Sequence, residues 1–278
     1  MSRALELKDQ ANRLFQNKNY NAAESVYSQA IMEDPKNAFL YTNRAMARLK
    51  LDYWDTAVAD CQSVLAMASA TPDATMKANY YLCQAQLALG EPEAALTAGL
   101  AAHAAYAAVN HKSLAAVTTA VLRAKKLQWE KRERKRVRQE QDLERDVLRL
   151  LRAEREADVA AAVDVGDELE RQAVEEEAQA KEERLTAVFE KSRQLGGQGL
   201  REVPDWAIDD ISFGFMVDPV MTKTGKSYER ASIMEHLRRY PYDPLTREPL
   251  VASELRPNIA LRQACEAFLD ENGWAADW

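Results

Sequence analysis

The sequence is poor in cysteine and has no long apolar run. Its three cysteines are scattered without paired spacing, so they indicate no disulfide framework and a reducing compartment. We therefore expect a cytoplasmic address, with a nuclear one also open. Residues 1–10 hold no apolar signal core, and the longest apolar stretch, residues 98–109, is short and interrupted by His103. No membrane span is predicted. The cysteines are Cys61, Cys83 and Cys265.

Metal ligands are scarce in the last quarter of the chain as well. Between residues 203 and 278 the soft ligands are His236 and Cys265, whereas a structural zinc site needs four ligands. A zinc finger is therefore excluded there, and we expect neither a metal nor another cofactor. The formal net charge of -7 argues against nucleic acid as a default partner.

The chain nevertheless holds enough apolar residues to fold. Its 278 residues predict about two domains, and a hydrophobic fraction of 47% can fill more than one small core. A globular protein is expected.

The first hundred residues repeat with a period of 34 residues. This pattern of small and large residues resembles the tetratricopeptide repeat, in which two antiparallel helices interlock through small side chains. We expect three repeats and a closing helix over residues 112–129, with prolines marking helix boundaries. The recurring positions are Ala11, Ala23, Tyr27 and Ala30, then Ala45, Ala57, Cys61 and Val64, and then, after four extra residues, Cys83, Ala95, Gly99 and Ala102.

Four polar residues occupy matching places in these repeats. Lys8 and Asn12 are four residues apart and share a helix face, and Asn43 and Lys77 lie at comparable positions in the next two repeats. Each one alone would be an ordinary solvated side chain. Together they resemble the carboxylate clamp of chaperone-binding tetratricopeptide domains. That resemblance implies that they bind the acidic C-terminal tail of heat-shock chaperones, whose carboxylates need several donors at once.

Aromatic residues near the clamp are candidate contacts for apolar side chains of such a tail. Phe15 and Tyr80 are predicted to play this part, although core packing is the common role of residues of this kind. A further polar residue that such clamps often have on a later helix is not assigned among Lys112, Ser113 and Thr118.

A charged region follows, without proline or glycine from residue 125 to Gly166. It predicts a long helix, a break at residues 164–167 and a second helix, so we expect a charged helical hairpin over residues 130–195. Apolar residues at helical spacing leave a face that favours a homodimer.

A basic cluster at residues 131–138 could be a nucleic-acid patch, but interleaved acids favour an ion-paired exposed helix. Glycines at residues 196–202 predict a hinge. The apolar residues at helical spacing in the expected hairpin are Leu143, Val147, Leu150, Leu151, Leu169, Leu185, Val188 and Phe189.

Residues 203–278 begin with apolar residues alternating with turn residues, which predicts a small unit of hairpin, helix and loop. Its motifs resemble the U-box family of ubiquitin ligases, whose fold is similar to a RING domain but is held by hydrogen bonds and salt bridges in place of zinc. The motifs are Ile211-Ser212-Phe213, Asp218-Pro219-Val220, Tyr228-Glu229-Arg230, Ile233, Leu237, Asp243-Pro244-Leu245-Thr246-Arg247 and Pro249-Leu250.

The resemblance also implies roles for residues in two loops. Ile211, Phe213 and Pro244 would form an apolar groove for a ubiquitin-conjugating enzyme, and Arg247 would steady the conjugated ubiquitin. Ordinary core burial is the alternative for Ile211 and Phe213. The one cysteine of this region, Cys265, lies outside the motifs, so we expect a scaffold without a covalent ubiquitin intermediate.

The order of these parts resembles a family of co-chaperone ubiquitin ligases along nearly the whole chain. The expected fold is mainly α: a tetratricopeptide array over residues 1–129, the hairpin, the hinge, and a small α+β U-box over residues 203–278. The expected function is ubiquitin transfer to chaperone-bound clients. A non-catalytic chaperone adaptor and a nucleic-acid-associated U-box protein are the alternatives.

Overall fold

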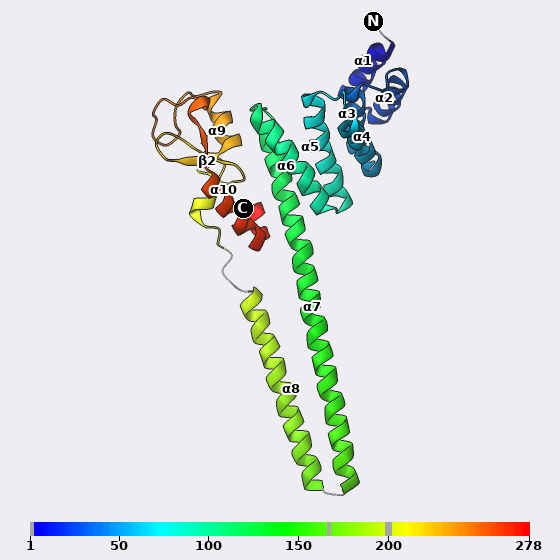
Figure 1. The fold of residues 1–278 in the computed structure, drawn as a ribbon, viewed down its shortest axis with the longest axis vertical. Coiled ribbons are helices and arrows are strands. Elements are labelled where there is room, and N and C mark those ends of the chain that lie inside the picture. The colour runs from blue at the N-terminus through cyan, green and yellow to red at the C-terminus, as the bar shows by residue number, and fades with distance from the viewer. Residues whose placement is uncertain (1–2, 166–167, 198–201) are drawn as a thin grey trace. The chain divides into compact units, whose positions relative to one another are not determined.

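The structure is a computed structural model, and it describes residues 3–165, 168–197 and 202–278. Contacts divide the chain into two compact units. One comprises Met1–Glu130 and Val203–Trp278, and the other comprises Lys131–Glu202. The expected mainly helical fold with a small α+β region is confirmed (Figure 1). No helix among the described residues is both long and apolar enough to cross a membrane.

The N-terminal region folds into six helices, in which each helix packs against the next along the chain. The recurring small residues are buried where helices meet; Ala11, Ala23, Ala45 and Ala57, for example, have no exposed surface. Three helical pairs of the expected repeat are therefore confirmed. The helices are α1 (Arg3–Gln16), α2 (Tyr20–Glu33), α3 (Ala38–Lys50), α4 (Trp54–Ala66), α5 (Pro72–Leu89) and α6 (Pro92–Ala108).

Gly99 stands where the earlier repeats have Tyr27 and Cys61, and the structure gives the reason. A Cβ atom at this position would lie 3.1 Å from Cys83 Sγ and 3.3 Å from Val121 Cγ2. Glycine thus lets α6 approach both α5 and the helix that follows. The departure from the repeat pattern is a packing requirement.

The following helix, α7 (Leu114–Val165), corrects the expectation of a closing helix that ends at Trp129. It continues without a break because the sequence there has no proline or glycine and consists largely of good helix formers. Ion pairs one turn apart support its charged part: Arg136 pairs with Glu133 at 2.7 Å and also with Glu140. The basic cluster is thus at least partly ion-paired.

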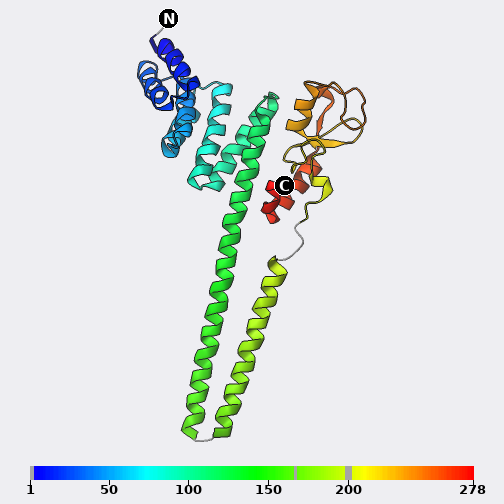
Figure 2. The same ribbon diagram turned by 180° about the vertical axis from the view of Figure 1, so that it is seen from behind.

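In the second unit α7 runs beside α8 (Glu168–Gly197), as both views show (Figure 2). Ion pairs Arg152–Glu182 and Arg193–Glu144 join the two helices, and their order along the chain makes the pair antiparallel. Of the expected break, Gly166 and Asp167 lie outside the described residues, as do residues 198–201 of the expected hinge. Several predicted apolar residues remain exposed on this hairpin: Leu143, Leu150, Leu169 and Val188.

The C-terminal region holds a three-stranded antiparallel sheet in the order β2-β1-β3. Its core packs Val220, Tyr228, Ile233 and Leu250, all nearly inaccessible to solvent. The elements are η1 (Asp205–Ala207), β1 (Pro219–Met221), β2 (Ser227–Glu229), α9 (Arg230–Leu237), η2 (Ala252–Glu254), β3 (Arg256–Pro257), α10 (Ile259–Glu271) and η3 (Gly273–Asp277).

The end of this region packs on the first part of α7, within the same unit. Trp129 Nε1 donates a hydrogen bond of 2.9 Å to Glu271 O. A Cβ atom at Gly273 would lie 2.3 Å from Trp129 Cβ, so only glycine allows this close approach. Lys126 and Asp277 form an ion pair at the same place.

Two buried aspartates organise the two large loops of the C-terminal region. Asp209 accepts hydrogen bonds from Ser212 N at 2.8 Å and Glu229 N at 2.9 Å. Asp243 accepts from Tyr228 Oη at 2.8 Å, and from the backbone of Leu245 and Thr246. Among the described residues no cluster of His, Cys, Asp or Glu could hold a metal ion. The bonds from backbone amides to the carboxylates of Asp209 and Asp243 hold the two loops in place.

A third carboxylate, that of Glu229, is also buried. Its Oε2 accepts hydrogen bonds from Val217 N at 2.8 Å and Asp218 N at 2.9 Å. Burial raises the pKa of Glu229 to about 7, and the neighbouring acids Asp218 and Asp209 add to this shift. Asp218 in turn pairs with Arg230 at 2.6 Å. A buried carboxyl with a raised pKa makes stability depend on pH.

We predict that Glu229→Gln alters the pH dependence of stability. Between pH 4.5 and about 7 the unfolded chain loses a proton that folded Glu229 keeps, so the free energy of unfolding falls as pH rises. Glutamine can still accept both amide bonds through its carbonyl oxygen and carries no charge. The difference in free energy of unfolding between the variant and the wild type should therefore shift by about 1–3 kcal/mol in favour of the variant as the pH rises from about 5 to about 8. Chemical unfolding at each pH measures this difference.

Glu248→Gln, at an exposed position of the second loop, is the matched control and should keep the wild-type pH dependence. Identical pH dependence of the Glu229 variant and the wild type would contradict the raised pKa.

Candidate functional site

The two asparagines of the expected clamp lie side by side although they come from different repeats. Asn43 Nδ2, on α3, donates a hydrogen bond of 3.4 Å to Asn12 Oδ1, on α1. Asn12 Oδ1 also accepts a bond of 2.7 Å from Tyr27 Oη, on α2. The buried body of Tyr27 thus fixes the orientation of the Asn12 amide, which leaves its NH2 group available as a donor.

The two lysines of the clamp approach one aromatic ring. Lys8 Nζ, on α1, lies 6.0 Å from the centroid of the Phe39 ring, and Lys77 Nζ, on α5, lies 5.7 Å from the same centroid. Lys77 also forms an ion pair of 2.8 Å with Asp73, one turn earlier on α5. The structure therefore brings Lys8 and Lys77, from different repeats, to the same ring, and the carboxylates of a peptide end could bind both cations.

Phe39 itself was not predicted from the sequence. It stands four residues before Asn43 on α3, so it shares the face that carries the clamp asparagine. That spacing is the signal which could have identified it.

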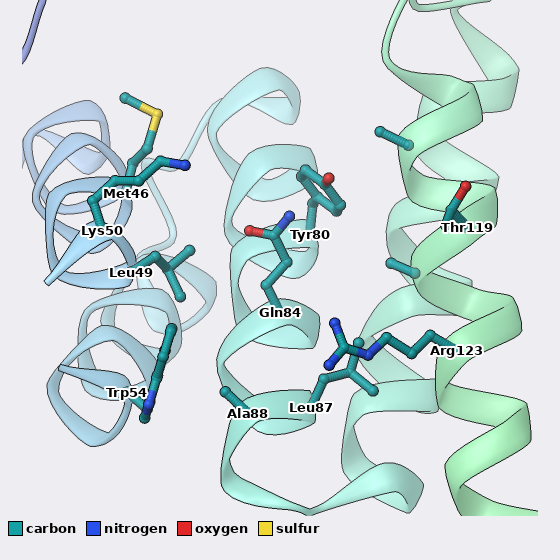
Figure 3. A pocket seen from close by; sticks show the side chains of 12 residues that line it. Met46, Leu49, Lys50, Trp54, Tyr80, Gln84, Leu87, Ala88, Thr119 and Arg123 are labelled. Carbon is teal, nitrogen blue, oxygen red and sulfur yellow. The ribbon is translucent and has the colours of Figure 1, made fainter. Parts of the chain in front are cut away.

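A pocket of about 510 Å³ continues the same helix faces beyond the clamp (Figure 3). Met46 and Lys50 follow Asn43 by three and seven residues, and Tyr80 and Gln84 follow Lys77 by the same steps. At a rise of about 1.5 Å per residue, the far end of the pocket is roughly 10 Å along the helices from the clamp. The remaining lining residues are Leu49, Trp54, Leu87, Ala88, Ala116, Thr119, Ala120 and Arg123.

The pocket combines apolar walls with two cations, Lys50 and Arg123. In the close view the Arg123 side chain extends from α7 toward α5 (Figure 3). Tyr80 contributes an aromatic wall, and burial raises the pKa of its phenol, so the hydroxyl stays neutral. Such a pocket can hold an apolar side chain and, at its rim, a carboxylate.

The other predicted groove residues are placed differently. Phe15 packs edge-on against Tyr20 at 5.1 Å and against the core around Ala11, and it is not among the described residues that line the pocket. Thr118 is buried, and its hydroxyl donates to Leu114 O. The polar residues of α7 that line the pocket are Thr119 and Arg123, and the sequence did not distinguish them from their neighbours.

The two loops of the C-terminal region are anchored by neighbouring residues of β2. Tyr228 binds Asp243 of the second loop through its hydroxyl, and Glu229 binds Asp209 of the first loop through its amide. The two loops are therefore fixed to one rigid strand. Any surface that both loops build together is preorganised by this arrangement.

Phe213 projects from the first loop with 74% of its surface exposed. Its φ of 56° is rare for a residue with a side chain, and the loop holds it there through a 2.8 Å bond from Phe213 N to Asp209 O. Ile211 is half-buried against the core around Val220, and Pro244 of the second loop is also half-buried. Core burial is thus excluded for Phe213, whereas Ile211 lies partly in the core.

Arg247 ends the second loop with φ at 62° and an exposed side chain. Its guanidinium carbon lies 5.2 Å from the centroid of the Tyr242 ring, and Nη1 donates a 3.2 Å bond to Tyr242 Oη. Tyr242 therefore supports the arginine from one side. This partner was not predicted from the sequence.

The cysteines offer no nucleophile. All three are buried, and burial raises the pKa of the Cys61 and Cys265 thiols to about 12 and that of Cys83 to about 11. A thiol with so high a pKa is almost entirely protonated at neutral pH, and only the thiolate is an effective nucleophile. A covalent ubiquitin thioester on this chain is chemically disfavoured.

Known proteins resemble both ends of the chain. The family model described as "U-box domain" matches residues 203–274. E3 ubiquitin-protein ligase CHIP of Arabidopsis thaliana is 28% identical over 283 residues, covering 98% of this chain and 95% of that protein. Small glutamine-rich tetratricopeptide repeat-containing protein beta of Homo sapiens is 44% identical over 62 residues, covering 22% of this chain and 20% of that protein.

Among solved structures, the first TPR of Spaghetti (RPAP3) bound to HSP90 peptide SRMEEVD has a TM-score of 0.36 and 28% identity, over 42% of this chain and 92% of that one. The chain thus contains a U-box domain, preceded by helical repeats, and it is similar along nearly its whole length to the ubiquitin ligase CHIP.

Proposed function

We infer that this protein is a co-chaperone ubiquitin ligase. It binds the acidic C-terminal tails of heat-shock chaperones through its clamp and promotes transfer of ubiquitin from a conjugating enzyme to chaperone-bound clients. The observation that carries this inference is the approach of Lys8 and Lys77 to one ring, in the same chain as a U-box. A peptide end with several carboxylates is complementary in charge to these two lysines.

Tail binding would replace an internal contact. Lys77 now pairs with Asp73, and an incoming carboxylate competes for the same ammonium group. Because this ion pair is half-exposed, it costs little to break. With its end at the clamp, the tail can run on along α3 and α5 and place an earlier side chain in the pocket of Tyr80 and Arg123.

Ubiquitin transfer would proceed by orientation. Phe213 and Pro244, with the exposed edge of Ile211, offer an apolar surface to the conjugating enzyme. Arg247, supported by Tyr242, would donate hydrogen bonds that restrain the conjugated ubiquitin. Restraining a flexible thioester near its acceptor raises the rate without a covalent step on this chain.

We also propose a homodimer in the cytoplasm, with the nucleus as a further location. Leu143, Leu150 and Val188 leave apolar surface exposed on the α7–α8 hairpin, and a second copy of the hairpin would cover it.

We predict that Lys8→Ala weakens binding of a peptide ending in Glu-Glu-Val-Asp by roughly ten- to a hundredfold, because one charged hydrogen-bond donor is lost. Self-ubiquitination should stay at the wild-type rate. Titration calorimetry with the peptide and a gel assay of self-ubiquitination measure the two effects. Lys36→Ala, in an exposed turn of the same region, is the control and should bind normally. Unchanged peptide affinity in the Lys8 variant would rule out the clamp.

We predict the converse for Phe213→Ala. Removing this exposed ring should reduce ubiquitin chain formation by about tenfold or more, since an aromatic anchor at an interface contributes roughly 2 kcal/mol. Peptide affinity should not change. Ile259→Ala removes another exposed apolar side chain, from α10, and serves as the control in the same reconstituted assay. Chain formation at the normal rate would show that Phe213 does not contact the conjugating enzyme.

A further inference from the structure

We propose that Phe39 is a positioning residue of the clamp, whose ring holds the ammonium groups of Lys8 and Lys77 ready for a peptide carboxylate. This inference rests on the proposed function of the clamp. It assigns a role to a residue that donates no hydrogen bond through its side chain and carries no charge.

The ring is fixed by the way α3 begins. Asn37 caps this helix, and its side chain accepts a 3.2 Å bond from Phe39 N. The body of the ring packs against the core cluster that contains Ala38 and Ala74. Phe39 therefore stands at the start of α3, half-buried, with its ring in contact with this core.

Two like charges from different helices meet at this ring. Lys8 comes from α1 and Lys77 from α5, and their Nζ atoms lie 6.0 and 5.7 Å from the ring centroid. A ring face attracts each cation by about 0.5–1 kcal/mol at an exposed site, which offsets part of the repulsion between them. The ring thus counteracts the tendency of two long side chains to move apart into solvent.

The ring differs in one respect from the other partner of Lys77. Asp73 is an anion, so it must give up the lysine when a peptide carboxylate arrives. Phe39 is neutral and leaves the hydrogen atoms of the ammonium groups free to be donated. The ring can keep its contact while the lysines bind the peptide carboxylate, so the lysine side chains are ordered both before and after binding.

The test measures binding of the full-length protein to a peptide ending in Glu-Glu-Val-Asp with a free C-terminus, and to the same peptide with an amidated C-terminus. Phe39→Leu should lower affinity for the free acid by roughly three- to thirtyfold, because two cation–ring contacts are lost. Affinity for the amide should fall less. Phe39→Tyr keeps the ring face and should bind the free acid within about twofold of the wild type.

A double-mutant cycle separates positioning from packing. If the ring acts through the lysines, Phe39→Leu should cost less affinity in a Lys8→Ala background than in the wild type. Equal losses in both backgrounds, or equal losses for free and amidated peptide, would overturn the proposal. Thermal unfolding checks each variant, and Phe39→Met replaces Phe39→Leu if the latter does not fold.

The two proposals fail in different ways. If Lys8→Ala binds the free acid as the wild type does, the clamp itself is wrong. If Lys8→Ala weakens binding and Phe39→Leu does not, the clamp stands and the role of Phe39 is overturned.

Discussion

Buried carboxylates bonded to backbone amides are what the C-terminal region depends on. Asp209 and Asp243 each gather the amides of one loop, and β2 supplies a partner to both. A buried carboxylate is costly unless its lone pairs are satisfied, so these loops adopt the conformations that satisfy them. The exposed position of Phe213 follows, because its left-handed backbone is part of the turn around Asp209.

The N-terminal region depends on a different constraint, the close approach of helices through small residues. Alanines at 11, 23, 45 and 57 are fully buried, and this packing turns the polar faces of α1, α3 and α5 toward a common groove. The clamp and the pocket are consecutive stretches of the same faces. The clamp residues lie on α1, α3 and α5, whereas the candidate residues for ubiquitin transfer lie in two loops of the C-terminal region, so single substitutions should separate binding from transfer.

Much of the fold could be predicted because it follows from local patterns. The period of 34 residues, the buried small side chains and the helical pairs agree in sequence and structure. The end of the closing helix could not be placed, since no residue near Trp129 stops a helix and only the structure shows that α7 continues. The burial of Glu229 was also not foreseen, because its charge argues for the surface.

The candidate site was less accessible to prediction. Lys8, Asn12, Asn43 and Lys77 were selected by position, but which of them touch each other depends on how three helices pack. Alternation alone does not say whether Phe213 faces solvent or core, because the answer lies in the turn around Asp209. Supporting residues such as Phe39 and Tyr242 become visible only when side chains distant in sequence are seen together.

We infer that the clamp selects the protein to which the U-box promotes ubiquitin transfer. An assay that combines the protein with a ubiquitin-charged conjugating enzyme and a heat-shock chaperone, with and without an excess of free-acid tail peptide, tests this coupling. We expect the peptide to suppress ubiquitination of the chaperone and to leave self-ubiquitination unchanged. Chaperone ubiquitination that continues at the same rate under saturating peptide would contradict this inference.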